Sequence, residues 1–313
     1  LTKPQNEEDA KRILSKISIK WVLIQCAKLP NPALTLRPMH KSSLHICLLV
    51  ISICLVALNS CNDYNKVLKS TDTEEKWAFA QAALDSNECF KALPLLEELV
   101  GLTRGTQRAE TVQYKYAEAH YCVNDFYLAR YYFTTYAKTF PNSHLVEEVE
   151  FKSAICSYNL SPNWSLDQTE TKSAIQELQL FMDKYPGSAL RDSSQTMIDQ
   201  LRGKLEKKSF ESAAIFHKTG QYKSATIALK NALKDFPDSQ YRAKMYFLIL
   251  DSYYQYALQS TDRRKIERFN DATEAFHTFA SRFPDSSYYS DAQNIYEDCV
   301  KSLETLETQQ QLN

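Results

Sequence analysis

The most regular feature of the chain is a set of apolar positions that recurs and ends each time at an aromatic residue followed by proline. An alanine stands eleven residues before each aromatic, and a large apolar residue follows the alanine by four positions, which places both on one face of a helix. Proline then ends the helix, because it has no N–H to donate. The endings are FPNS at 140–143, YPGS at 185–188, and FPDS at 236–239 and 283–286, and the pairs are Ala129 and Phe133, Ala174 and Leu178, Ala225 and Leu229, and Ala272 and Phe276.

This spacing predicts helical hairpins, in which the alanine admits a close neighbouring helix and the apolar residue fills the space beside it. An earlier unit around Ala80, Ala92 and Leu96 fits the pattern but has Gly101 in place of the closing proline. The serine after each proline is expected to cap the next helix, with acidic residues such as Glu147 completing a capping-box-like start. We therefore expect an all-α fold with hairpins over 73–86/88–101, 107–123/125–140, 143–160/168–185, 189–218/221–236 and 239–260/266–283, and a terminal helix near 287–307. The alternative is an unrelated helical bundle.

The hairpins resemble the tetratricopeptide repeat, on the strength of Gly220, Tyr222 and Ala225 in one unit and of Phe126 and Ala129 in another. The resemblance implies a right-handed α-solenoid whose first helices line a concave peptide-binding groove. The family's inward positions map onto Trp77, Gln81, Tyr114, Glu118 and Tyr121. Tyrosine and tryptophan suit such a groove, because they supply a large contact area with few rotatable bonds. For Trp77 and Tyr114, a position in the seam between two hairpins is an alternative of equal weight. The run 131–133 is expected in a seam.

Residues 39–60 have the layout of a secretory signal, with a basic start and an uncharged apolar run at 44–58. That run is shorter than the roughly 20 residues of a membrane-spanning helix, which makes a retained span the weaker reading. The segment Leu58-Asn59-Ser60-Cys61 resembles a bacterial lipobox, which implies that Cys61 is acylated and begins the mature protein. The alternative is an ordinary signal peptide with a chance cysteine. We expect 61–71 to be a lipidated tether, 72–313 to be the repeat array, and 1–38 to be a non-native upstream extension or a cytoplasmic extension on a retained anchor.

Composition narrows the classes of function. The chain has only 5 Gly against 19 Tyr and 15 Phe, which disfavours a fold built on glycine-rich phosphate loops. Residues 1–60 hold 8 basic and 3 acidic residues, which leaves 29 basic and 35 acidic residues in 61–313, a net charge of −6. Phosphate recognition needs a concentrated basic face, and we therefore expect no nucleic-acid partner. The basic run 263–265 is expected to be a solvated turn within the last hairpin.

The sequence contains no catalytic constellation of the familiar kinds, and we expect neither an enzyme nor a metal or cofactor site. His120 and His217 are expected to pack or to line the groove, while the carboxylates at 97–98 and 147–148 are expected to face water. The cysteines after residue 61 are Cys89, Cys122, Cys156 and Cys299, and they lack metal-binding spacing. We expect each to act as a small buried hydrophobe. One disulfide among them is compatible with an oxidising compartment, but the residues do not lead us to expect it.

The lipobox, the segments DYNKVLKS at 63–70 and ALPLLEEL at 92–99, and the proline-closed repeats together resemble the BamD family, lipoprotein subunits of the outer-membrane β-barrel assembly machinery. The resemblance covers 61 to about 308. It implies an adaptor anchored in the outer membrane and facing the periplasm, whose carboxy-terminal repeats bind a BamA-like barrel subunit and other assembly-complex subunits. Its amino-terminal repeats would bind unfolded outer-membrane protein precursors. The alternatives are another periplasmic repeat lipoprotein that coordinates envelope or peptidoglycan machinery and, disfavoured by size, a glycan-capturing lipoprotein.

Overall fold

The computed structural model describes residues 63–312. The predicted signal segment, the lipidation site Cys61 and the upstream extension lie outside the described residues. The chain divides into two compact units, of which Lys66–Asn313 contains the helices α3 to α13. The residues that the structure describes form helices and turns, without strands, and the predicted all-α array is confirmed.

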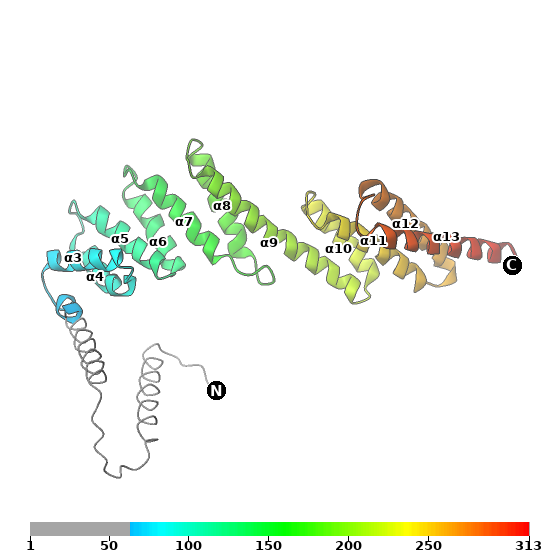
Figure 1. The fold of residues 1–313 in the computed structure, drawn as a ribbon, viewed down its shortest axis with the longest axis horizontal. Coiled ribbons are helices and arrows are strands. Elements are labelled where there is room, and N and C mark those ends of the chain that lie inside the picture. Colours follow the sequence, from blue (N-terminus) through cyan, green and yellow to red (C-terminus); the bar gives the residue numbers. More distant parts are fainter. Residues whose placement is uncertain (1–62, 313) are drawn as a thin grey trace, which may run out of the picture. The chain divides into compact units, whose positions relative to one another are not determined.

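The helices of this unit follow one another as antiparallel hairpins, and each packs chiefly against its neighbours in the sequence (Figure 1). Five hairpins are followed by a terminal helix, as predicted. In order, the helices are α3 (Thr73–Asp85), α4 (Cys89–Leu102), α5 (Ala109–Cys122), α6 (Phe126–Thr139), α7 (Val146–Leu160), α8 (Thr169–Lys184), α9 (Arg191–Lys218), α10 (Tyr222–Asp235), α11 (Arg242–Leu258), α12 (Asp262–Arg282) and α13 (Tyr289–Leu312).

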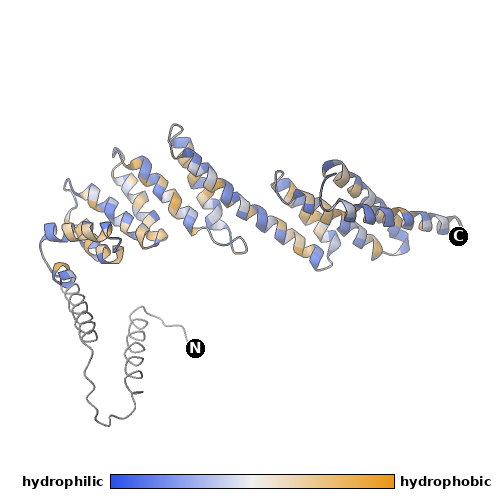
Figure 2. Ribbon diagram, in the orientation of Figure 1, coloured by the Kyte–Doolittle hydropathy of each residue, from blue (hydrophilic) through white to orange (hydrophobic). Residues whose placement is uncertain are grey.

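The repeated alanine and apolar positions form the contacts between helices. The four alanines are each 0% exposed, as are Phe133, Leu178 and Leu229, while Phe276 is 7% exposed. Figure 2 shows hydrophobic and hydrophilic residues interspersed along the helices of the array. The small alanine side chain lets two backbones approach closely, and the large side chain one turn later fills the resulting seam. The sequence pattern therefore describes the core correctly.

The serine that follows each proline stabilises a turn that precedes the next helix. Ser143 Oγ accepts a hydrogen bond from the N–H of Leu145 at 3.1 Å, and α7 begins only at Val146. The equivalent serines of the other turns accept from the N–H two residues on in the same way. The N-cap of α7 is thus Leu145, two residues after the expected one. The carboxylate that Ser143 contacts belongs to Glu110 of the preceding hairpin, at 2.6 Å, and not to Glu147.

The length of α9 explains why the middle repeats look stretched in the sequence. Ile198 and Leu201 in its first half pack with Ala174 of α8 in one core cluster. Phe210 in its second half packs with Leu229 of α10 in the next cluster. One 28-residue helix therefore serves two successive hairpin cores, which ties the third and fourth hairpins together.

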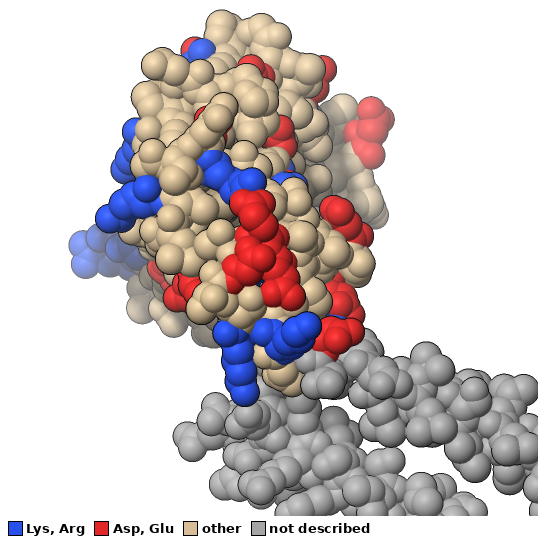
Figure 3. Space-filling view, turned by 90° about the vertical axis from the view of Figure 1, so that its left-hand side faces the viewer, with Lys and Arg blue, Asp and Glu red and all other residues tan. Residues whose placement is uncertain are grey.

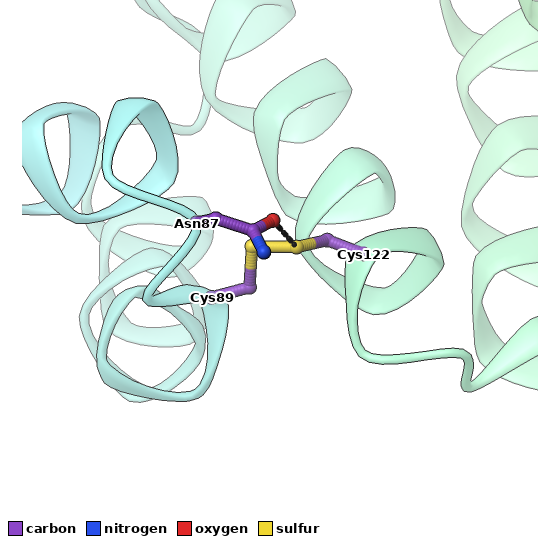
Figure 4. The surroundings of a disulfide bond; sticks show 3 residues. All are labelled: Asn87, Cys89 and Cys122. Atoms are coloured by element: carbon purple, nitrogen blue, oxygen red, sulfur yellow. Dashed lines mark hydrogen bonds between the residues drawn. A yellow bond between two sulfur atoms is a disulfide. The ribbon is translucent and has the colours of Figure 1, made fainter.

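Two cysteines that we expected to be separate buried thiols form a disulfide. Cys89 begins α4, Cys122 ends α5, and their Cα atoms lie 6.2 Å apart (Figure 4). Asn87 Oδ1 lies 3.3 Å from Cys122 Sγ, a contact in which the disulfide sulfur has no proton to donate. The expectation was wrong here, because stacking of the first two hairpins brings together helix ends that are 33 residues apart. Cys156 and Cys299 are free and buried, as expected.

The basic run 263–265 lies in the first turn of α12 and not in a loop, which corrects the prediction. Arg264 Nη1 donates to Glu267 Oε2 at 2.7 Å, and Lys265 Nζ donates to Asp262 Oδ1 at 3.0 Å. These local pairs along one helix satisfy the charges, because residues three apart are neighbours on a helix surface.

Candidate functional site

The predicted groove residues lie on the first helices of the first two hairpins. Trp77 and Gln81 are on α3, and Tyr114, Glu118 and Tyr121 are on α5. Gln81 is exposed and the other four are half-buried. Residues four apart on a helix share a face, so Tyr114 and Glu118 point to the same side of α5. The fold thus holds part of each side chain and leaves part of it accessible.

Lys152 of α7 joins Tyr114 and Glu118 into one polar cluster. Its Nζ donates to Tyr114 Oη and to Glu118 Oε1, each at 2.7 Å, and lies 2.8 Å from Glu148 Oε1. Tyr114 Oη in turn donates to Glu148 Oε1 at 2.8 Å, and Lys115 Nζ donates to Glu118 Oε2 at 2.8 Å. An ammonium has three protons, and the three oxygens around Lys152 accept all of them. We call these five residues the Lys152 cluster.

Titration of the cluster follows from these contacts. Burial alone would raise the pKa of Glu118, but the hydrogen bonds from Lys115 and Lys152 outweigh it and lower the pKa. The hydrogen bond from Lys152 lowers the pKa of Glu148. Burial opposes the charge of Lys152, yet its hydrogen bonds to the two carboxylates and to Tyr114 raise its pKa. Both carboxylates and the ammonium are therefore charged at neutral pH.

Tyr121 lies one turn further along α5, beside the cluster. Its ring packs against Phe126 at 5.6 Å and against Phe133 at 6.5 Å between ring centroids. It also lines a pocket of about 310 Å³ that contains the disulfide. The pocket offers an aromatic surface beside a carboxylate and an ammonium, which suits a peptide with an apolar side chain and a polar backbone. Its lining residues are Leu84, Asp85, Cys89, Lys115, Glu118, Tyr121, Cys122, Phe133 and Lys152.

Trp77 belongs to a second pocket of about 340 Å³, which it lines with Gln107, Arg108 and Thr111. The guanidinium carbon of Arg108 lies 5.9 Å from the centre of the Trp77 ring, within range of a cation–π contact. The structure therefore brings three predicted groove residues, Tyr114, Glu118 and Tyr121, to one place and puts Trp77 in another. Tyr114 also contacts Tyr136 edge-on at 6.0 Å, which shows that it serves the seam and the surface together.

Lys152 and Glu148 were not predicted as site residues from the sequence, and the carboxylate of Glu148 was expected to face water. A signal for both exists in the period of the repeat. Lys152 stands 34 residues after Glu118, and Glu148 stands 34 residues after Tyr114. Because tetratricopeptide-type repeats recur about every 34 residues, a residue faces its equivalent in the next hairpin. Glu98 was likewise expected in water, but it accepts a hydrogen bond from the buried Lys76.

Replacing Lys152 by methionine is expected to lower the free energy of unfolding by about 1–3 kcal/mol at pH 7, because two carboxylates lose their partner. The pKa values of Glu118 and Glu148 lie below the unfolded value of about 4.3. Their contribution is therefore present above that pH and lost as pH falls through the folded values. The difference between the variant and the parent protein should shrink accordingly in acid. Urea unfolding followed by circular dichroism at pH 7 and at pH 3.5 measures both effects.

The matched control is Lys234→Met, which removes an exposed lysine from α10. Its effect should stay within about 0.5 kcal/mol at both pH values, as is usual for surface positions. A loss at Lys152 that is equally large in acid would show that methionine acts through packing and that the charge network contributes little.

The histidines on first helices have internal contacts. His120 is buried between the rings of Tyr116 and Tyr132, with centroids at 4.7 and 5.1 Å, and burial lowers its pKa. His217 Nε2 lies 2.7 Å from Asp251 Oδ2 on α11. Both histidines therefore serve contacts within the array. In the described part of the chain, no group of three or more potential ligands is arranged to hold a metal ion.

Charged side chains of both signs lie on the face that Figure 3 shows. Basic groups lie mainly along the left and lower edges of this view and acidic groups mainly at its centre and right, with broad uncharged areas between them. Among the described helices none is long and apolar enough to cross a membrane. The face in Figure 3 thus combines charged and uncharged areas.

A stack of helical hairpins with partly exposed aromatic residues and a polar cluster on its first helices defines a helical-repeat protein of the kind that binds other proteins. The family model described as YfiO, outer membrane lipoprotein, matches residues 69–267. The chain belongs to this family of outer membrane lipoproteins. Among solved structures, a TPR repeats protein from Bacteroides fragilis is similar, with 13% identity and a TM-score of 0.36 over 74% of this chain and 100% of that chain. No curated protein matches the chain.

Proposed function

We propose that this protein is a lipid-anchored scaffold subunit of the machinery that assembles β-barrel proteins in the outer membrane. The observation that carries the proposal is membership of an outer membrane lipoprotein family over residues 69–267. The resemblance of 63–70 and 92–99 to the BamD family supports the finer assignment. In this role the protein binds a BamA-like barrel subunit, other assembly-complex subunits and unfolded precursors, and it catalyses no reaction.

The first helices of the amino-terminal hairpins are the proposed site for precursors. An unfolded barrel strand offers alternate apolar side chains and unpaired backbone N–H and C=O groups. Tyr121 and the pocket beside it offer apolar surface, while Glu118 and Tyr114 offer oxygen atoms along the same helix. The apolar surface can pack against the apolar side chains of such a strand, and the oxygen atoms can accept hydrogen bonds from its backbone N–H groups. Trp77 adds a second aromatic position on α3.

The anchor is proposed at Cys61, outside the described residues. Each buried methylene of an acyl chain contributes roughly 0.8 kcal/mol, so that several chains hold a protein in the bilayer for its working life. The tether 61–71 would then lead from the membrane to α3, which begins at Thr73. This arrangement holds the array at the outer membrane, facing the periplasm.

Affinity purification of the full-length tagged protein from detergent-solubilised envelopes tests this function. We expect a large β-barrel protein with periplasmic domains to co-purify. Recovery of the intact lipidated protein without such a barrel protein contradicts the proposal. Recovery with peptidoglycan machinery instead would establish the alternative role.

The control is Cys61→Ser, which removes the acylated thiol and leaves the hairpins unchanged. The parent protein should begin at Cys61 with the mass of its acyl chains, whereas the variant should lose processing and acylation and keep its helical circular dichroism. A variant that is still processed before residue 61 and still carries acyl chains would show that the lipobox assignment is wrong. This outcome is separate from the identity of the partner.

A further inference from the structure

The second helices carry two adjacent pockets that the proposed precursor site does not use. One pocket, of about 510 Å³, lies between α4, α5 and α6, and the other, of about 660 Å³, lies between α6, α7 and α8. Tyr131 and Thr135 of α6 line both of them. The two pockets therefore form one surface with α6 as the ridge between them, and we call it the α6 surface.

Large apolar side chains are unusually exposed along this surface. Tyr131 is 60% exposed, Tyr127 one turn before it is 57% exposed, and Leu180 of α8 is 68% exposed. All three line the pocket between α6 and α8. Tyr131 had been expected in a seam with its neighbours, and only Phe133 and, in part, Tyr132 are buried there. Contiguous exposed apolar groups beside a hollow are typical of surfaces that bind a partner.

The charge of the α6 surface is opposite to that of the array. Its two pockets are lined by four basic residues and two acidic ones, a net charge of +2, whereas residues 61–313 carry −6. Glu150 accepts hydrogen bonds from Lys184, and Glu177 lies 3.7 Å from Arg130. The two acids are thus each matched by a basic residue, and the excess charge belongs to Arg104 and Lys138. An acidic partner complements this surface.

The equivalent place in the last two hairpins has the opposite charge. The pocket between α10, α11 and α12 has a volume of about 280 Å³ and is lined by Lys230, Asp271 and Glu274, a net charge of −1. Burial and the neighbouring carboxylates raise the pKa of Asp271, which shows that negative charge is already crowded there. An acidic segment would therefore select the α6 surface over its repeat equivalent.

We propose that the α6 surface binds a short acidic segment of another protein that places one large apolar side chain in each pocket. A helix with its side chains is about 10 Å across, which sets the spacing of two side chains that straddle α6. Residues seven apart on a helical segment, or three apart on a polyproline-type segment, have this spacing on one face. Carboxylates beside these two side chains meet Arg104 and Lys138. The site is independent of the proposed function, and its two pockets share no lining residue with the Lys152 cluster.

A membrane surface fits these features less well. A lipid layer presents no separate side chains to fill two hollows. A segment with two apolar side chains fills both hollows and keeps its carboxylates over the basic residues. The observations therefore favour a protein partner.

The test uses fluorescent 12-residue acidic peptides that carry two leucines three or seven residues apart, titrated with the full-length protein in detergent. We expect at least one spacing to bind, and its lysine-for-glutamate counterpart to bind at least tenfold more weakly. Tyr131→Glu should weaken binding at least tenfold, because it places a negative charge between the two pockets. Binding should also weaken as salt is raised.

The matched control is Ile227→Glu on α10, which stands at the repeat position of Tyr131, two residues after the packing alanine, and is 55% exposed. It should change the affinity by less than twofold. The proposal is overturned if no acidic peptide binds better than its basic counterpart or if Tyr131→Glu leaves binding unchanged. It is also overturned if Tyr131→Glu instead reduces sedimentation of the Cys61→Ser chain with phosphatidylglycerol vesicles, which would assign the surface to the membrane. None of these results depends on recovery of a barrel protein.

Discussion

Replacing Phe133 by alanine is expected to lower the free energy of unfolding by about 3–5 kcal/mol, because the substitution leaves a cavity where a large buried side chain was. Phe133 is fully buried at the centre of the second hairpin, in a cluster with Ala117, Ala129 and Val149 from three successive helices. Loss of its ring therefore loosens α5, α6 and α7 together. Urea unfolding measures the loss, and hydrogen exchange should show it concentrated in these helices.

The matched control is Phe90→Ala on α4, the same substitution at a residue that is 73% exposed. Its effect should lie within about 0.5 kcal/mol of zero. In a stack of repeats each unit depends mainly on its neighbours, so that α12 and α13 should keep their exchange rates in the Phe133 variant. Uniform destabilisation of the whole array would contradict this nearest-neighbour description. A loss no larger than that of the control would mean that Phe133 contributes little to the core.

The fold was predictable because one pattern recurs along the chain. Ala129 and Phe133 alone fit many helical proteins, but the same spacing at 174, 225 and 272 leaves few alternatives to stacked hairpins. Helix ends were less predictable. The serine turn at 143 delays α7 by three residues, because its hydroxyl is used by the N–H of Leu145 before the helix begins. Such turn geometry has no distinct signature in the hydrophobic pattern.

Contacts between hairpins were hidden for a different reason. They join residues one repeat apart, as in Tyr114 with Glu148 and His217 with Asp251, each 34 residues apart. A search along one helix for pairs three or four residues apart does not find them. The predicted groove residues fall on the first helices α3 and α5, where the resemblance had placed them. Lys152, which contacts Tyr114 and Glu118, could be found only by adding one repeat length to Glu118.

The disulfide is the other contact of this kind, and it was missed although both cysteines were considered. Cys89 and Cys122 are 33 residues apart, nearly one repeat length. One begins a second helix and the other ends the following first helix, and stacking brings these two helix ends to the same edge. The cysteines at 156 and 299 have no such partner among the described residues and remain thiols. The pairing therefore follows from the stacking of the repeats.

Removing this disulfide, by reduction or by replacing Cys89 and Cys122 with alanine, is expected to destabilise the first hairpin by about 3–4 kcal/mol. Cross-linking residues some 30 apart restricts the unfolded chain by roughly that amount. The first hairpin packs against a neighbouring hairpin at α5 and depends strongly on this link, whereas an inner hairpin packs on both sides. Hydrogen exchange with and without a reducing agent should therefore show faster exchange in α3 and α4, while α8 to α13 change little.

The double variant supplies the internal control, since a reducing agent should not change its exchange further. A Cys156→Ala variant should respond to the reducing agent as the parent protein does, because Cys156 is a buried free thiol. Digestion without reduction should release one cross-linked peptide pair that contains residues 89 and 122, and its absence would contradict the pairing. Both cysteines line the same pocket as Tyr121 and Glu118. Breaking the disulfide should therefore also weaken binding in this pocket. The redox state of the compartment would then affect binding at the proposed precursor site, because it determines whether the first hairpin is cross-linked.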